Sequence, residues 1–148
     1  MSGLRVREAV AEDFLVVAEL LAELGRAEVT AETREQCRRL YGEQVADLHA
    51  CHLVAEDAGT VIAFCALHFR GRLNYPSRDA WIPDLIVTAA ARRRGAARAL
   101  IEAAERIARE RGCWQLTLES GYGRAEAHLL YAACGMADKG KYFGKRLT

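Results

Sequence analysis

The stretch that decides the fold is residues 87–104, which read VTAAARRRGAARALIEAA. Aliphatic residues before it are typical of a strand, and apolar residues at helical spacing follow Gly95. Three arginines, a glycine and small alanines therefore fall where a strand gives way to a helix. The free N–H groups and the macrodipole of a helix N-terminus favour an anion, and small residues let a phosphate come close. The stretch predicts either a diphosphate site or a solvated charge run.

Composition predicts one domain over residues 1–148, with 51% hydrophobic residues, 28% charged residues and a net charge of +1. Such a charge gives no global field that would attract nucleic acid. No stretch approaches the roughly 20 apolar residues of a membrane span, and the N-terminus lacks the apolar core of a signal peptide. We expect a cytoplasmic protein with neither a nucleic-acid nor a membrane partner.

The cysteines and histidines do not predict a metal site. The five cysteines are scattered and lie mostly among apolar neighbours, as free core cysteines of a reducing compartment do. His49, His52 and His68 have no metal-ligand spacing with cysteine or carboxylate partners. A nucleophilic cysteine is the alternative that this pattern leaves open.

Hydrophobic periodicity predicts the element order β-α-α-β-β-β-α-β-α-β. Strands are expected at residues 4–8, 51–56, 61–69, 80–87, 114–120 and 140–148, the last as a strand or hairpin arm. Helices are expected at residues 14–24, 30–48, 97–111 and 124–134. The sequence DAGT at residues 57–60 predicts a hairpin, and a strand–helix–strand unit follows it. The fold class is therefore α/β with a mixed sheet.

Two blocks resemble the GNAT N-acetyltransferase superfamily. Residues 84–104 resemble its acetyl-CoA signature, a strand followed by R/Q-x-x-G-x-G/A and an amphipathic helix, here as Arg92, Gly95 and Ala97. Residues 124–136, RAEAHLLYAACGM, are similar to its second block, an alanine-rich helix ending in F-Y-x-x-x-G-F, with Met136 in place of the last Phe. The resemblance covers nearly the whole chain. It implies a mostly antiparallel sheet, splayed around acetyl-CoA and flanked by about four helices.

The resemblance also implies where acetyl-CoA would bind. The pantetheine arm would pair with the end of the strand before the signature, and the backbone amides of the signature turn would hold the diphosphate. The cofactor-binding residues implied in this way are Leu85, Ile86, Val87, Arg92, Arg93, Arg94, Gly95, Ala96, Ala97 and Arg98.

The catalytic residues implied are Tyr131 and Asp84. A phenol, with a pKa near 10, is protonated at neutral pH and can pass a proton to the departing thiolate; Tyr131 can also be a packing aromatic. Relatives often carry Glu-Asp where this chain has Pro83 and Asp84, so Asp84 is the base only if a bulge turns it inward. Otherwise the proton leaves through water or another group, and Glu119 is the second candidate.

The expected acceptor is a small-molecule primary amine such as a polyamine, an aminophosphonate or an amino acid. The loops at residues 23–30 and 70–79 are expected to line its pocket, with Glu23, Glu28 and Asp79 able to attract a cation. Three alternatives remain open: a protein amine as the acceptor, a non-catalytic acyl-CoA-binding module, and a nucleic-acid-binding protein that uses the arginines. Relatives are often homodimers, so a homodimer is possible.

Overall fold

The computed structural model describes residues 3–120 and 124–148, which form two compact units divided after Leu118. The first unit carries all of the assigned strands and every assigned helix but one. Its strands are β1 (Leu4–Glu8), β2 (Leu53–Asp57), β3 (Thr60–Cys65), β4 (His68–Arg70), β5 (Asp79–Ile82), β6 (Leu85–Val87) and β7 (Leu116–Leu118). Its α-helices are α1 (Phe14–Glu23), α2 (Arg34–Ala46) and α3 (Ala96–Glu110), and its short 3-10 helices are η1 (Ala11–Asp13) and η2 (Ala89–Ala91).

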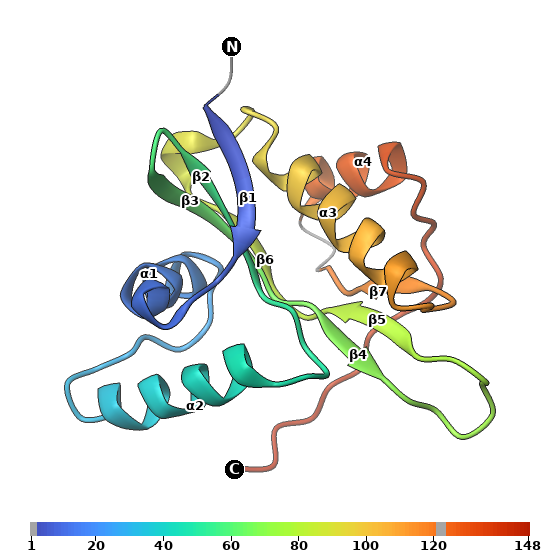
Figure 1. Ribbon diagram of the computed structural model, residues 1–148, viewed down its shortest axis with the longest axis horizontal. Helices are drawn as coiled ribbons and strands as arrows, with labels where there is room; N and C mark the ends of the chain where they lie inside the picture. Colours follow the sequence, from blue (N-terminus) through green and yellow to red (C-terminus); the bar gives the residue numbers. More distant parts are fainter. Residues whose placement is uncertain (1–2, 121–123) are drawn as a thin grey trace. The chain divides into compact units, whose positions relative to one another are not determined.

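The strands form two sheets (Figure 1). One has the order β1-β2-β3-β6 and is antiparallel throughout; the other has the order β4-β5-β7, with β4 antiparallel and β7 parallel to β5. The predicted hairpin is confirmed, because Ala58 and Gly59 join β2 and β3 with positive φ values of 50° and 86°. A two-residue turn with both φ values positive matches the twist of the paired strands. The predicted α/β class with a mixed, mostly antiparallel sheet is confirmed as well.

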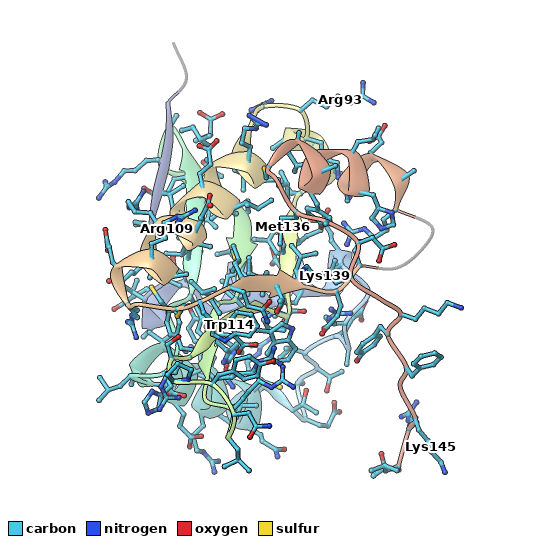
Figure 2. All side chains as sticks on the ribbon, turned by 90° about the vertical axis from the view of Figure 1, so that its right-hand side faces the viewer. Arg93, Arg109, Trp114, Met136, Lys139 and Lys145 are labelled. Carbon is cyan, nitrogen blue, oxygen red and sulfur yellow. The ribbon has the colours of Figure 1, made fainter. Side chains whose placement is uncertain are left out.

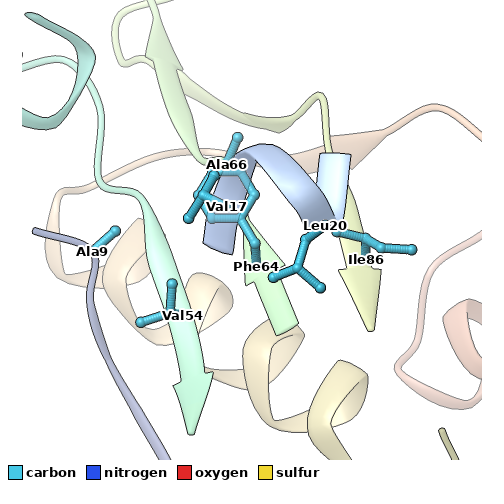
Figure 3. Packing of buried hydrophobic residues seen from close by; sticks show 7 residues of the cluster. All are labelled: Ala9, Val17, Leu20, Val54, Phe64, Ala66 and Ile86. Carbon is cyan, nitrogen blue, oxygen red and sulfur yellow. The ribbon is translucent and has the colours of Figure 1, made fainter. Parts of the chain in front are cut away.

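The amphipathic helices α1 and α3 cover opposite sides of the four-stranded sheet (Figure 1). On one side, Val17 and Leu20 of α1 pack against Val54, Phe64 and Ile86 of three neighbouring strands (Figure 3). On the other side, α3 packs on β1, β2, β3 and β6 through a stripe of buried residues that are at most 4% exposed. The stripe consists of Ala96, Leu100, Ile101, Ala103, Ala104 and Ala108.

Two predicted strands are each divided by an interruption at the same place in the fold. The run at 61–69 divides into β3 and β4, and the run at 80–87 divides into β5 and β6. Pro83 cannot donate a ladder hydrogen bond, which favours a break at this point. The amide of Ala66 donates to the carbonyl oxygen of Asp84 at 2.9 Å, so the interruptions face each other. The two sheets separate here.

The second unit contains α4 (Ala125–Ala133) and the C-terminal segment. The strand predicted at residues 140–148 is wrong, because the structure assigns neither helix nor strand there. The adjacent Tyr142 and Phe143 are both strongly exposed, so the segment has no alternating buried face that would stabilise a strand. Figure 2 shows Lys139 and Lys145 along this coil.

Candidate acetyl-transfer site

The turn at residues 92–95 joins the end of β6 and η2 to the N-terminus of α3. Gly95 is the residue before α3 and has φ of 87° and ψ of 8°, the left-handed conformation that glycine adopts without steric cost. A Cβ at Gly95 would meet no other atom within 4 Å, so open space lies over the first turn of the helix. Arg93 also has a positive φ, 68°, and its side chain extends from the surface in Figure 2. The local geometry is that of an exposed helix N-terminus that an anion can approach.

Two of the three arginines of this turn, Arg92 and Arg94, have hydrogen-bond partners on neighbouring strands. Arg94 Nη1 donates to Asp57 Oδ2 at 3.1 Å, which ties the turn to the end of β2. Arg92 Nε lies 3.5 Å from the carbonyl oxygen of Val87. All three arginine side chains are exposed. They therefore supply positive charge at the mouth of the helix N-terminus without being buried.

Glu23, one of the carboxylates expected on the acceptor side, holds the connection that leads to this turn. One of its carboxylate oxygens accepts from Thr88 Oγ1 at 2.8 Å, and the other accepts from the amide of Ala89 at 3.1 Å. The last residue of α1 thus fixes the first residues after β6.

β6 has the features of a strand to which an extended ligand can add. It pairs with β3 through the register Ala63 with Val87 and Cys65 with Leu85, and it is the last strand in its sheet. Leu85 and Ile86 are buried at 8% and 3% exposure, so the strand is rigidly anchored. Its other edge faces away from β3, and strand-like addition of a ligand uses such an edge.

Asp84 lies in the interruption before β6, and its carboxylate is ion-paired. Arg26, in the connection after α1, donates from Nε to Asp84 Oδ1 at 2.7 Å and from Nη2 to the carbonyl oxygen of Pro83 at 3.2 Å. The Asp84 side chain is 23% exposed. The interruption therefore turns the carboxylate toward the α1 connection, where a guanidinium already compensates its charge.

Asp79 was expected to attract a cationic amine, and this expectation is wrong. Its side chain is 1% exposed, and both of its oxygens accept hydrogen bonds of 3.1 Å from Arg70. Arg70 also lies over the ring of Trp81, 4.5 Å from its centroid. The carboxylate is thus a structural partner of Arg70.

Glu28 does line a hollow. The hollow, of about 490 Å³, is formed by α1, the connection after it and the start of α2. Its lining residues are Leu15, Ala18, Glu19, Ala22, Glu23, Glu28, Val29 and Arg34.

Tyr131 lies on α4 in the second unit. Its ring centroid is 6.4 Å from that of His128, and His128 Nε2 lies 3.2 Å from Ser120 Oγ. The backbone carbonyl oxygen of Tyr131 accepts a hydrogen bond from the amide of Met136 at 2.9 Å, and this bond closes the end of α4 at Gly135. The predicted second candidate base, Glu119, begins this unit and is exposed.

The buried cysteine thiols are poor candidates for a nucleophile. Burial and a hydrogen bond from Cys51 Sγ to Glu8 Oε1, at 3.3 Å, raise the pKa of Cys51 to about 11. Burial also raises the pKa values of Cys65 and Cys113. A high pKa keeps the thiol protonated and unreactive at neutral pH.

The described residues contain no group of three or more His, Cys, Asp or Glu placed to hold a metal ion. Within the same residues, no helix is long and apolar enough to cross a membrane.

A cluster of two histidines and a tryptophan lies near Asp84, and no sequence pattern predicts it. His52, which precedes β2, contacts His68 of β4 with ring centroids 5.1 Å apart, and His68 contacts Trp81 at 5.9 Å. Neither ring nitrogen of the buried His52 has a hydrogen-bond partner among the described residues. The pairing of β4 with β5 brings Trp81 to His68, and the contact of residues 50–51 with residues 67–68 brings His52 there, so no sequence spacing indicates the cluster.

Comparison with known proteins identifies the class. A family model described as "Acetyltransferase (GNAT) family" matches residues 15–136. Glucosamine 6-phosphate N-acetyltransferase 1 of Oryza sativa subsp. japonica is 33% identical over 115 residues, which are 74% of this chain and 68% of that protein. The chain therefore belongs to the GNAT family and is an N-acetyltransferase, as the sequence predicts.

Solved structures agree on the fold. The crystal structure of a transcriptional regulator from Bacillus halodurans C-125 superposes with a TM-score of 0.89 at 22% identity, covering 97% of this chain and 99% of that one. An aminoglycoside N-acetyltransferase, AAC(6')-Iy, in complex with CoA superposes with a TM-score of 0.79 at 18% identity, covering 99% and 95%.

Proposed function

We propose that this chain transfers the acetyl group of acetyl-CoA directly to a primary amine of a small molecule. The observation that carries the proposal is the left-handed Gly95 at an open helix N-terminus, directly after the edge strand β6. An anion bound there gains from the N–H groups and dipole of α3. The named relative that acts on glucosamine 6-phosphate supports a small acceptor.

The cofactor site in this proposal has two parts. The diphosphate binds to the backbone of Arg93, Gly95 and Ala97, with positive charge from the remaining arginines of the turn. The pantetheine arm pairs with Leu85–Val87, whose neighbouring N–H groups polarise the thioester carbonyl. Such preorganised donors stabilise the oxyanion of the tetrahedral intermediate by up to a few kcal/mol.

Tyr131 is the proposed general acid. During transfer the amine nitrogen attacks the thioester carbon, the C–N bond forms and the C–S bond breaks. The departing thiolate takes the phenolic proton, and the nitrogen loses an N–H proton that returns to the phenolate through water. Asp84 is the proposed carboxylate on the acceptor side, where its ion pair with Arg26 ties the α1 connection to the start of β6.

We also propose that residues 1–148 form one transferase domain, since the family match spans both units. Homodimer formation stays a prediction.

The test is the release of free thiol from acetyl-CoA with a panel of amines. The panel contains glucosamine 6-phosphate, spermidine, aminoethylphosphonate, L-alanine and a peptide with a free N-terminal alanine. We expect turnover with a small-molecule member. Turnover with the peptide alone would assign a protein acceptor. Binding of acetyl-CoA without turnover of any member would refute the enzymatic proposal and favour a regulatory acyl-CoA-binding module.

A further inference from the structure

A pair of histidines lies beside the interruption of the sheets, on the side that carries α1. His68 opens β4 directly opposite Trp81 of β5. His52 contacts His68 and also Phe64, with ring centroids 5.9 Å apart in the second contact. Phe64 belongs to the cluster formed with Val17 of α1. The pair is therefore on the α1 side of the strands.

The same place adjoins the strand that is proposed to bind the pantetheine arm. Ala66, two residues before His68, donates its amide to Asp84, and β6 begins at the next residue, Leu85. A thioester polarised by the N–H groups near Leu85 lies close to this interruption. An amine that approaches from the α1 side reaches this interruption on the face that carries His68.

His68 is half-buried and neutral at neutral pH. Its burial lowers its pKa below the ordinary value of 6.5; Asp47 and Asp84 act in the opposite direction, and Arg70 lowers the pKa further. His52, the remaining ionisable group against it, is itself neutral because burial lowers its pKa to about 4. A neutral imidazole has a lone pair that can accept a proton.

The neighbouring carboxylates are less suited to this task. Arg26 holds Asp84, and Arg70 holds the buried Asp79. A guanidinium therefore already occupies the position at which a substrate ammonium would contact each carboxylate. The negative charge of a carboxylate nevertheless favours a cation nearby, and Asp84 does so for His68.

We propose that His68 accepts the proton that the acceptor ammonium loses before attack. This rests on the proposed function. The N–H bond of the ammonium breaks, its proton moves to the imidazole, and the freed electron pair attacks the thioester carbon. Asp84 stabilises the resulting imidazolium, which returns the proton to water after the product leaves. After attack the nitrogen loses a second proton as the C–S bond breaks. The thiolate takes the proton of Tyr131, and the phenolate regains the nitrogen's second proton through water, so that atoms and charge balance.

The experiment compares the native chain with His68→Gln, His68→Ala and the control His49→Gln. His49 is exposed on the segment before β2 and lies outside the cluster. Thiol release is measured with each panel amine that the native chain acetylates, and the Kd for acetyl-CoA is measured separately. We expect both His68 variants to lose about 10²–10⁴-fold in kcat/KM, the usual contribution of a general base, with an unchanged Kd. His49→Gln should match the native chain.

Two readouts separate proton transfer from a structural role. Added imidazole should restore part of the turnover of His68→Ala. The acid limb of the native kcat/KM profile should lie below pH 6.5 and vanish in His68→Gln.

Each contrary result has a distinct meaning. The inference is overturned if His68→Gln turns over as fast as the native chain, or if imidazole does not restore the turnover that His68→Ala loses. Either result leaves the proposed function intact. A native chain that acetylates no panel amine overturns both.

Discussion

Replacing His52 with leucine removes a buried imidazole whose protonation opposes folding. The side chain is 6% exposed, and its burial, with a smaller contribution from His68, lowers the pKa from 6.5 to about 4. In the unfolded chain the same imidazole titrates near its ordinary value. The unfolded state therefore binds more protons than the folded state between these two pH values.

The sign and the size of the effect follow from this difference. Stability rises with pH wherever the unfolded state binds more protons, so the native chain loses stability as the pH falls from about 6.5 to about 4. At 1.36 kcal/mol per unit of pKa, the loss that His52 causes at pH 4 is roughly 3 kcal/mol. His52→Leu lacks this imidazole. Between pH 6.5 and pH 4 its free energy of unfolding should therefore fall by roughly 3 kcal/mol less than that of the native chain.

The assay is urea unfolding followed by circular dichroism at several pH values between 4 and 7, on the native chain, His52→Leu and His49→Gln. We expect the free energies of unfolding of native and leucine chains to diverge steadily below pH 6.5. The exposed His49→Gln should follow the native curve. Parallel curves for the native and His52→Leu chains would show that His52 is not buried in its neutral form, and would refute the reasoning.

Two further substitutions test separate parts of the account. Tyr131→Phe removes only the proposed acidic hydroxyl, so kcat should fall by about 10²–10⁴-fold while the Kd for acetyl-CoA stays constant. Tyr142→Phe, in the exposed C-terminal coil, is the matched control. An unchanged kcat in Tyr131→Phe would show that Tyr131 is not the general acid. Leu100→Ala leaves a cavity under the fully buried face of α3 and should cost about 2–5 kcal/mol in urea unfolding. The exposed Arg106→Ala on the same helix should cost no more than about 0.5 kcal/mol, and equal costs for the two would contradict the assigned helix face.

Local chemistry made several parts of the fold predictable from sequence. The hairpin at residues 57–60 needs a two-residue turn with positive φ values, and Ala58 and Gly59 supply it. The start of α3 was predictable because Gly95 marks the strand-to-helix turn and apolar residues follow at helical spacing. Both signals lie within a few residues of the structure that they determine.

The features that were missed depend on contacts between distant segments. The pairing of Arg70 with Asp79 requires β4 and β5 to be adjacent, and it converts a predicted acceptor carboxylate into a buried structural one. The contact of His52 with His68 likewise joins two segments that no periodicity links. Residues 140–148 were predicted as a strand from their local pattern but form a coil. A strand-like pattern becomes a strand only where a partner edge is present, and the sequence does not show whether one is.

The most direct test of the central claim is calorimetric titration of acetyl-CoA into the native chain, Gly95→Val and Gly112→Val. Both glycines have positive φ, 87° and 73°, and a Cβ at either meets no protein atom within 4 Å, so the two variants carry comparable backbone strain. If the N-terminus of α3 holds the diphosphate, the native chain and Gly112→Val bind acetyl-CoA, and Gly95→Val binds more than about tenfold more weakly, a loss above 1.4 kcal/mol. Equal affinities for all three chains, or no binding by the native chain, would contradict the account.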